Sequence, residues 1–578
     1  MLNYEFSWGP STFAAVVAAS AALIYVLRWL ALPKPFPGIP YNEESANRVL
    51  GDMPLIRAAR SRRTWFAETA LSFNSPLSQI FFPFTSPLLI CADPVEANDI
   101  CTRRLKEFKR NSALQSIFGC VIPNHHIGMA DDDPRFKKNR ELVRDLMTPA
   151  FLHEVRTTGE VSAPQIYDKG ARLVELWTEK MRISNGRPFE AGRDIHNMAL
   201  DIILSVAFNR DESLGVTMRN TAHLANLPVQ SAAKDETEPA TIENLPLDTE
   251  AQVFNAMTDS VGMIFKSPLP RLRGWFLKRT DWMKKAMASK DEMTTRELAK
   301  AVERMEASEP PRCAMDQILL RERAMAEKEG RQPDYYSPTI RDELLGYLVA
   351  GHDTTSSAFQ WGLKFIARNQ PAQKRLRATL REAFPSAAAS GRAPTATEIL
   401  KTQIPYLDAV VEEILRCCET LPITSREAKV DTQVLGHHVP KGTVVLFIGN
   451  GPGYLRPAIP VDESKRTTET AKHAAHRAHV WDPADVDAFK PERWMKKTTE
   501  DGEEKEVFDA TSGPFMPFGY GPRACFGKRL AYMEMRIVLC HVIWAFELET
   551  VSKELDSSTR IEALATTPGD CYVKLRNV

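Results

Sequence analysis

The stretch Phe518-Gly519-Tyr520-Gly521-Pro522-Arg523-Ala524-Cys525-Phe526-Gly527 places a single cysteine in a loop that glycines interrupt. Gly519 and Gly521 allow backbone turns that a side chain would block, and Gly527 lets a flat ring approach closely. Apolar residues then recur at helical spacing, so Cys525 lies at or just before a helix N-terminus, where amide dipoles favour a thiolate. No second cysteine or histidine lies nearby in the sequence, which indicates haem rather than zinc as the group bound by this thiolate. Arg523 supplies a fixed cation for an acidic group.

At these residues the chain resembles the cytochrome P450 family of haem-thiolate monooxygenases, whose signature F-x-x-G-x-R-x-C-x-G is matched at every fixed position. The resemblance implies a membrane-anchored, microsomal and fungal-like member. Its fold would be mainly α with a small β region, and haem b (iron protoporphyrin IX) would lie between a long central helix and the cysteine loop. Cys525 would be the axial ligand, and Phe518, Gly519, Arg523 and Gly527 would bind the cofactor. The alternative for a lone cysteine is an ordinary buried thiol.

A second motif, Ala350-Gly351-His352-Asp353-Thr354-Thr355, lies in a segment that reads as one helix of about 30 residues. Ser337-Pro338 is its start signal, Asp342 and Glu343 suit its first turn, and Pro371 closes it. Gly351 and the threonine hydroxyls can open the hydrogen-bond ladder locally. We expect Asp353 and Thr354 to be catalytic, supplying protons to bound oxygen. The alternative for this triplet is a solvated polar face.

Two further motifs bear on the architecture. Glu413 and Arg416 lie three residues apart on a helix, and the resemblance implies that Arg493 of Pro491-Glu492-Arg493-Trp494 joins them in a buried triad that locks the loop carrying Cys525. We class these three residues as structural. An isolated pair of this kind is more often an exposed salt bridge.

Arginines are the candidates for contacts with the haem propionates. In one register Phe136 and Arg140 match the family's helix on the proximal side of the haem, and a register one turn later would use Arg140 and Arg144. Arg426, which follows the turn at 421–424, resembles another propionate contact. The alternative for each arginine is a solvated surface charge.

The N-terminus predicts a membrane anchor. Residues 13–32 are apolar apart from Ser20 and Arg28, and the basic residues follow this run. We therefore expect a single-pass anchor over 1–32, a proline-rich hinge over 33–40 and a catalytic domain over 41–578 that faces the cytosol from the endoplasmic reticulum membrane. A cleaved signal peptide is the alternative.

Composition limits the partners. A net charge of zero over 578 residues argues against nucleic-acid binding, and nine cysteines without C-x-x-C spacing disfavour a disulfide framework or a zinc site. No G-x-G-x-x-G follows a strand, so NADPH and flavin must reside on another protein. NADPH-cytochrome P450 reductase is the implied partner, with cytochrome b5 as a second donor. The expected basic docking face consists of Lys137, Lys138, Lys528 and Arg529.

The expected reaction inserts one oxygen atom from O2 into a C–H bond of a lipophilic small molecule, such as a product of secondary metabolism. A haem-thiolate isomerase or dehydratase, or a non-catalytic haem protein, remains an alternative. Beyond the helices, we expect strands near 80–91 and 434–448. Three charged or polar stretches read as surface insertions: 230–252, 303–336 and 456–477.

Overall fold

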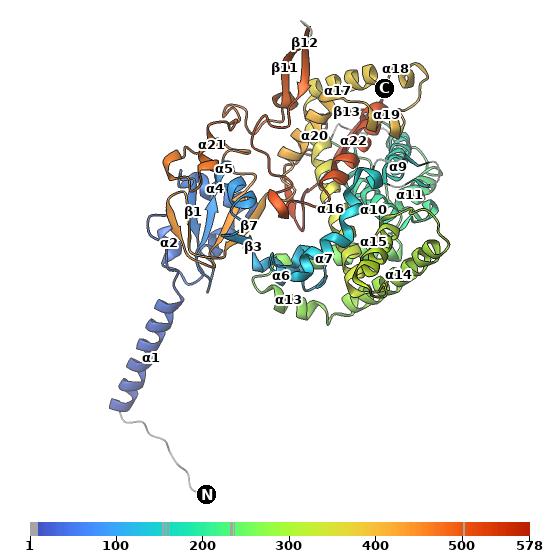
Figure 1. Cartoon of the computed structure of the whole chain (residues 1–578). Helices are drawn as coiled ribbons and strands as arrows, with labels where there is room; N and C mark the ends of the chain where they lie inside the picture. Colours follow the sequence, from blue (N-terminus) through green and yellow to red (C-terminus); the bar gives the residue numbers. More distant parts are fainter. Residues whose placement is uncertain are drawn as a thin grey trace. The chain divides into compact units, whose positions relative to one another are not determined.

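Two compact units make up the chain. The computed structural model describes residues 10–152, 155–156, 159–160, 162–231, 235, 237–500 and 503–578. One unit comprises Met1–Lys109 and Ile423–Ala478, and the other comprises Arg110–Pro422 and His479–Val578. Each unit is treated separately below, with the element labels of Figure 1.

The smaller unit is built on a five-stranded sheet with the order β1-β2-β10-β7-β3. β1 and β2 are antiparallel, β10 runs parallel to β2 with Leu446 opposite Ile90, and β7 is antiparallel to β10. This arrangement confirms the strands expected near 80–91 and 434–448. Its elements are α1 (Pro10–Ala31), α2 (Glu43–Ala46), α3 (Met53–Ala58), α4 (Arg62–Ser72), β1 (Leu77–Ile80), β2 (Leu88–Cys91), α5 (Pro94–Thr102), β3 (Phe108–Arg110), β7 (Ile423–Ala428), β8 (Thr432–Val434), β9 (His437–Val439), β10 (Val444–Ile448) and α21 (Glu469–Ala475).

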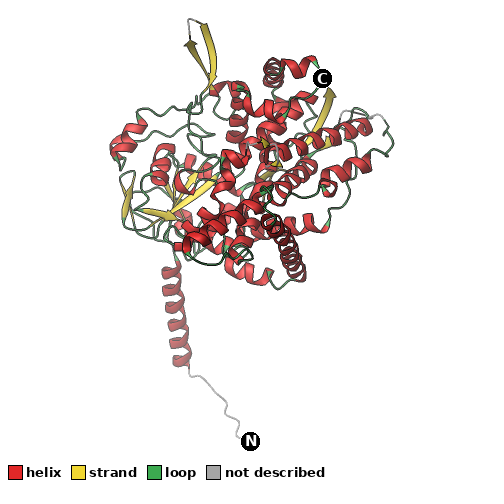
Figure 2. Cartoon of the chain, turned by 45° about the vertical axis from the view of Figure 1, so that its right-hand side comes forward, coloured by secondary structure: helices red, strands yellow, loops and turns green. Residues whose placement is uncertain are grey.

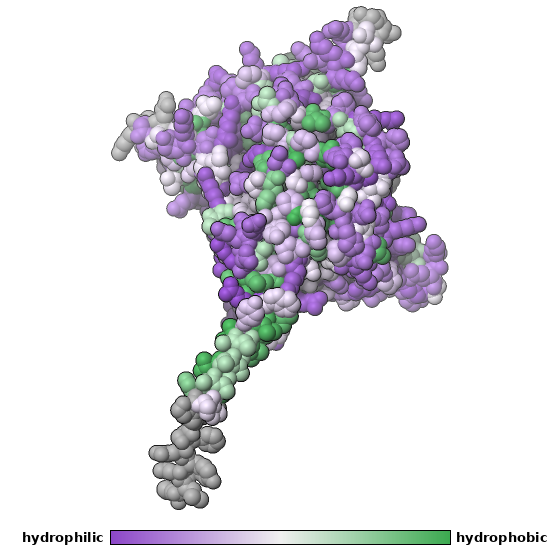
Figure 3. All heavy atoms as spheres, turned by 90° about the vertical axis from the view of Figure 1, so that its left-hand side faces the viewer, coloured by the Kyte–Doolittle hydropathy of each residue, from purple (hydrophilic) through white to green (hydrophobic). Residues whose placement is uncertain are grey.

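Helix α1 is long and apolar enough to cross a membrane. Ser11–Ala31 has a mean hydropathy of 1.9 and is not buried against the protein, and its hydrophobic surface is plain in Figure 3. The proline-rich segment after it is attached to the sheet of its own unit, because the Gln79 side chain hydrogen-bonds the backbone of Phe36 and Ile39. The length and composition of α1 fit a single-pass anchor.

The polar stretch 456–477 is fastened by a buried arginine. Arg466 has a side chain only 3% exposed and pairs with Asp93 and Glu463. Thr468 adds a hydrogen bond of 2.9 Å to Asp99. Contacts with Asp93 and Asp99 therefore hold this polar stretch against the rest of its unit.

The larger unit is mostly helical, as Figure 2 shows. Its helices of eight residues or more are α7 (Pro134–Val143), α9 (Ser162–Ser184), α10 (Gly192–Phe208), α11 (Val216–Leu224), α12 (Thr249–Phe265), α13 (Pro270–Leu277), α14 (Asp281–Glu306), α15 (Ala314–Glu329), α16 (Pro338–Arg368), α17 (Gln370–Ala383), α20 (Pro405–Cys417) and α22 (Lys528–Ala545). Shorter helices are α6 (Ser112–Phe118), α8 (Pro149–Leu152), α18 (Pro385–Ala389) and α19 (Ala396–Lys401), and the strands are β4 (Val155–Arg156), β5 (Gly159–Glu160), β6 (Phe189–Glu190), β11 (Met495–Glu500), β12 (Glu503–Phe508), β13 (Phe546–Glu549), β14 (Arg560–Glu562), β15 (Thr566–Pro568) and β16 (Tyr572–Asn577).

Helix α16 is the longest helix of this unit. It begins as expected, because the Ser337 side chain accepts a hydrogen bond from the amide of Ile340 and Pro338 occupies the first turn. Its 31 residues correspond to about 46 Å. α10 and α22 pack against it, so the centre of α16 belongs to the core of the unit.

The interpretation of 303–336 as a surface insertion was wrong. Residues 314–329 form α15, which buries Ile318, Leu319 and Ala326. Two of its acids, Asp316 and Glu322, are buried as well and pair with Arg304 and Arg331. The high charge count concealed an apolar stripe at helical spacing. Of the stretch 230–252, residues 232–234 and 236 lie outside the described residues.

Candidate active site

The cysteine loop has the backbone that its glycines predicted. Gly519 and Gly521 have φ values of +66° and +70°, a conformation that side chains disfavour. The amide of Cys525 donates a hydrogen bond of 2.8 Å to the carbonyl of Phe518. α22 begins at Lys528, so Cys525 lies just before a helix N-terminus, as expected.

The thiol of Cys525 is accessible. All nine cysteines fall within the described ranges, and Cys525 is the one that is exposed. It is nevertheless recessed, and the surrounding protein raises the pKa of its thiol, while hydrogen bonds from the amides of Gly527 and Lys528 oppose that rise. The amides at the start of α22 thus favour the thiolate, as expected, but burial acts in the opposite direction on the same pKa.

A flat group has room beside this sulfur. A Cβ at Gly527 would have the Cys525 Sγ, 4.0 Å away, as its nearest neighbour, so the glycine leaves open space on that side. The backbone of Gly527 is ordinary, with φ of −79°. Its backbone therefore does not require glycine, and the close approach of a flat ring at Gly527 stays a prediction.

The centre of α16 presents a second accessible surface. Ala350 is exposed and Thr354 is partly exposed one turn later, although Val349, His352 and Thr355 are buried. The Thr354 hydroxyl donates a hydrogen bond of 2.7 Å to the Ala350 carbonyl. The helix is continuous through this point, so the expected local opening of its backbone hydrogen bonds is absent from α16. The Thr354 hydroxyl instead adds a bond to a carbonyl of the helix.

Asp353 is held at the same level of the helix. One of its carboxylate oxygens, Oδ2, accepts a hydrogen bond of 3.2 Å from the amide of Ala565, in the loop between β14 and β15. The carboxylate is only partly buried. Asp353 and Thr354 thus sit together on the accessible part of α16, with their side chains fixed by backbone groups.

Arg140 faces the cysteine loop from α7. Its guanidinium lies over the ring of Phe526, 5.0 Å from the centroid, and no residue that the structure describes gives it a hydrogen bond or ion pair. Burial lowers the pKa of Arg140, while Glu343 and Cys525 oppose this shift. Arg144 instead is exposed and pairs with Glu141 and Asp145. Of the two registers, the one using Phe136 and Arg140 brings its arginine to the cysteine loop.

Arg523 is engaged with the segment before α7. Its guanidinium pairs with Asp131, donates a hydrogen bond of 2.9 Å to the Met129 carbonyl, and lies 3.5 Å from the centroid of the Phe136 ring. Phe136 therefore supports Arg523 rather than offering a hydrogen bond of its own. Arg426 lies on β7 of the smaller unit, where it is buried and bonds the Ser425 carbonyl. Its proposed role with haem stays a prediction.

The triad implied by the resemblance is present and buried. Glu413 accepts hydrogen bonds from Arg416 at 2.8 Å and from Arg493 at 2.9 Å. The indole of Trp494 and the amide of Lys490 complete its coordination. Arg416 also bonds the carbonyls at 486 and 488, so the triad ties α20 to the segment that leads toward the cysteine loop.

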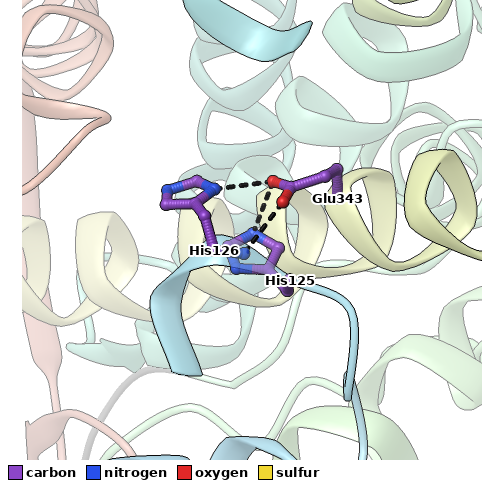
Figure 4. Close-up of side chains that lie close together, drawn as sticks. All are labelled: His125, His126 and Glu343. Carbon is purple, nitrogen blue, oxygen red and sulfur yellow. Dashed lines mark hydrogen bonds and ion pairs between the residues drawn. The ribbon is translucent and has the colours of Figure 1, made fainter. Parts of the chain in front are cut away.

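Sequence reasoning missed one buried cluster. We expected Asp342 and Glu343 to suit the first turn of α16, but both are buried and accept hydrogen bonds from other segments. Figure 4 shows Glu343 beside the two histidines. Asp342 accepts from Asn124, and Glu343 accepts from His126 and Asn139. The signal in the sequence was a pair of adjacent acids, Asp342 and Glu343, directly before the apolar residues Leu344 and Leu345. Acids that are buried with such a run need partners from other segments.

Comparisons with known proteins agree with this geometry. The Cytochrome P450 family model matches residues 81–452 and 471–575, and so omits much of the 456–477 insertion. Cytochrome P450 monooxygenase TRI13 of Fusarium sporotrichioides is 34% identical over 98% of this chain and 99% of its own length. Cytochrome P450 monooxygenase GME11363 of Pestalotiopsis microspora is also 34% identical, over 99% of both chains. In fold, the chain is similar to a crystal structure of the cytochrome P450DA heme domain, with a TM-score of 0.64 and 17% identity over 95% of this chain and 98% of that one.

The residues present fit the cofactor of that family, a haem with a cysteine thiolate ligand. Cys525 offers an accessible thiol with two amides beside it, and Gly527 leaves room for a flat ring. Arg140, which has no ion-pair partner in the part of the chain that the structure describes, offers a cation for an acidic group. Family membership further implies O2, a small-molecule substrate and a redox partner. The chain therefore belongs to the cytochrome P450 family of monooxygenases, among relatives from fungi.

Proposed function

We propose that this enzyme inserts one oxygen atom from O2 into a C–H bond of a lipophilic small molecule, with electrons from NADPH-cytochrome P450 reductase and from cytochrome b5 as a second donor. The observation that carries the proposal is the Cys525 loop, with its exposed thiol between glycine turns and a helix N-terminus. Secondary metabolism fits the relatives' names, which do not fix the substrate of this chain.

Cys525 would hold haem b, whose iron, when thiolate-bound, supplies the activation of oxygen. Phe518, Gly519, Arg523, Gly527, Arg140 and Arg426 are the proposed cofactor-binding residues. The ring of Phe518 packs at a tilt against Tyr532, with 5.4 Å between ring centroids, which fixes one side of the loop. Arg140 would pair with an acidic group of the cofactor, because it has no internal partner of its own among the described residues.

Asp353 and Thr354 would move protons on the opposite side of the site. The carboxylate of Asp353 is partly accessible, so it can exchange a proton with water while the Ala565 amide holds Oδ2 in place. The Thr354 hydroxyl donates to Ala350 at rest, which leaves its oxygen lone pairs free to accept a hydrogen bond. Rotation of this hydroxyl would then let it donate its proton to a bound group, while the backbone hydrogen bonds of α16 stay intact.

Substrate recognition would rest on apolar contacts. We propose that the loop ahead of α7 and the helix α16 line the substrate pocket. Their buried apolar residues include Ile122, Met129, Leu345 and Leu348. His352 has its Nδ1 atom bonded to the Leu348 carbonyl at 2.9 Å, which suits a structural role better than substrate orientation. A lipophilic substrate follows from this composition.

The redox partner would dock on the cysteine side of the larger unit. Lys137 and Lys138 on α7, and Lys528 and Arg529 at the start of α22, are all exposed. These four cations offer a basic surface for an acidic electron-transfer domain. With α1 as anchor, we place the enzyme on the cytosolic side of the endoplasmic reticulum membrane, where such a reductase can meet it.

Isotope labelling tests this function. The full-length enzyme, reconstituted in vesicles with NADPH-cytochrome P450 reductase, would be incubated with a bound lipophilic compound under ¹⁸O2. We expect one ¹⁸O atom in the product and a requirement for both NADPH and reductase. Product formed without reductase and without ¹⁸O would instead favour the isomerase or dehydratase.

A further inference from the structure

The carboxylate of Glu343 is buried, takes part in three hydrogen bonds and has one longer contact with His125; Figure 4 shows it beside the two histidines. Oε1 accepts from the His126 amide at 2.8 Å and from the Asn139 side chain at 2.9 Å. Oε2 lies 2.7 Å from His126 Nδ1 and 3.4 Å from His125 Nε2. No lysine or arginine among the described residues lies within ion-pair distance of it, so the two imidazoles are its main partners.

The hydrogen bonds assign the tautomers of both histidines. His125 Nδ1 accepts a hydrogen bond of 2.9 Å from the amide of Ile127, so the proton of this ring is on Nε2 and points to Glu343. His126 donates from Nδ1, because Glu343 is an acceptor there. The Nε2 atom of His126 is therefore unprotonated in the neutral ring.

These tautomers argue against a metal ion, although the three possible ligand atoms lie within 4.8 Å of one another. An ion bound to His125 Nε2 would move the ring proton to Nδ1. That proton would face the amide proton of Ile127. A hydrogen-bonded dyad of Glu343 and His126 is the better description of the cluster.

The open nitrogen of His126 belongs to a basic rim beside the cysteine loop. The His126 ring lies 5.8 Å from the Phe526 ring, and the Arg140 guanidinium lies 5.0 Å from the same ring. Neither Arg140 nor His126 Nε2 has a hydrogen-bond partner among the residues that the structure describes. Arg110 and Arg523 add positive charge around His126.

We propose that His126 Nε2 and the Arg140 guanidinium together bind a carboxylate, and that Glu343 is the residue that positions His126 for this contact. The inference rests on the proposed haem function and extends it. As the carboxylate binds, the neutral imidazole takes up one proton from water. The resulting imidazolium donates from Nδ1 to Glu343 and from Nε2 to the bound carboxylate. The carboxylate has two sources, a haem propionate or an acidic substrate.

The charges around His126 give this contact a pH dependence. Burial and the charges of Arg140, Arg110 and Arg523 lower the pKa of His126 to about 3. Glu343 on α16 and an incoming carboxylate act in the opposite direction, so binding raises the pKa of His126. A group whose pKa rises on binding strengthens the complex at low pH, and this contribution is lost as the pH rises through the bound-state value.

Transfer of haem to excess apomyoglobin tests the proposal. For the wild-type holoenzyme we expect transfer to accelerate as the pH rises above the unbound pKa of His126, about 3, and through its higher bound-state value. His126→Phe keeps the aromatic contact with Phe526 but removes both nitrogens. It should transfer haem roughly ten- to hundred-fold faster at the low end of this range and lose the pH dependence, the loss expected for one hydrogen bond between charged groups. The matched control is His125→Asn, which keeps an acceptor for the Ile127 amide and should retain the wild-type pH dependence.

Two further arms distinguish the sources of the carboxylate. Wild-type protein reconstituted with haem dimethyl ester, which has no free propionate, should lose the pH dependence if a propionate is the partner. If the ester behaves like native haem, and His126→Phe instead weakens the spectral titration with a fatty acid, the partner is the substrate. If His126→Phe and the ester leave both measurements unchanged, the proposal is wrong. The ester arm needs no mutation, so a failure of His126→Phe to fold does not leave the proposal untested. A thiolate-type spectrum in every sample shows that the haem assignment stands in either case.

Discussion

Replacing Arg416 with alanine should destabilise the larger unit severely. Arg416 is 4% exposed and donates two hydrogen bonds to Glu413, both of 2.8 Å, and two more to the carbonyls at 486 and 488. Its removal leaves Glu413 buried with fewer partners and takes a donor away from each of the two carbonyls, of which the one at 488 keeps a hydrogen bond of 3.2 Å from Arg493. Breaking one side of a buried pair costs about 3 to 5 kcal/mol, a large part of the roughly 5 to 15 kcal/mol that a typical domain has.

A matched arginine on the surface gives the control. Arg375 also pairs with two glutamates, Glu492 and Glu506, but its side chain is 35% exposed. Arg375→Ala should therefore cost only about 0 to 1 kcal/mol. Both variants would be compared by thermal unfolding and by the amount of haem bound per polypeptide.

We expect Arg375→Ala to match the wild type, and Arg416→Ala to give haem-free or aggregated protein. Recovery of haem-loaded Arg416→Ala with an unfolding midpoint equal to that of Arg375→Ala would refute the reasoning. It would mean that Trp494, Lys490 and Arg493 satisfy Glu413 without Arg416. The triad would then be dispensable for the cysteine loop.

The remaining predictions concern catalysis and the membrane. Thr354→Ala keeps helix propensity but removes the hydroxyl bonded to Ala350, so NADPH oxidation through the reductase should persist while product per NADPH falls; unchanged coupling would exclude Thr354 from proton delivery. Deleting residues 1–32 should release the protein from membranes in part and leave the haem spectrum unaltered, because the apolar surface of α1 is not buried against the protein. The retained binding should be lost when Trp275 and Phe276 on α13, which are 48% and 54% exposed, are changed to serine in the shortened protein; equal vesicle flotation of the two shortened proteins would contradict this role.

The motifs that the sequence predicted well are local in the chain. The Cys525 loop depends on φ values that glycine alone favours, and α16 has start and stop signals within its own sequence. Both could be placed without any knowledge of distant residues. The Glu413 triad needed the resemblance as well, because Arg493 is 80 residues away from its partner.

What escaped prediction depends on long-range contacts. His126 and Glu343 lie 217 residues apart, and no local pattern specifies that they meet. Arg140 and Arg144 could not be separated either, since they lie one turn apart at the end of α7. Only packing shows that Arg140 lies over Phe526 while Arg144 is exposed. In α15, the number of charges concealed the apolar stripe that buries the helix.

The carbon monoxide spectrum of the reduced protein tests the central claim most directly. Cys525 is the exposed cysteine in the glycine loop, and the others are at least partly buried. We predict the long-wavelength Soret band of thiolate-ligated haem for the wild type, and its loss in Cys525→Ser. A Cys525→Ser protein that binds haem and keeps this band would contradict the account, because another residue would then be the ligand.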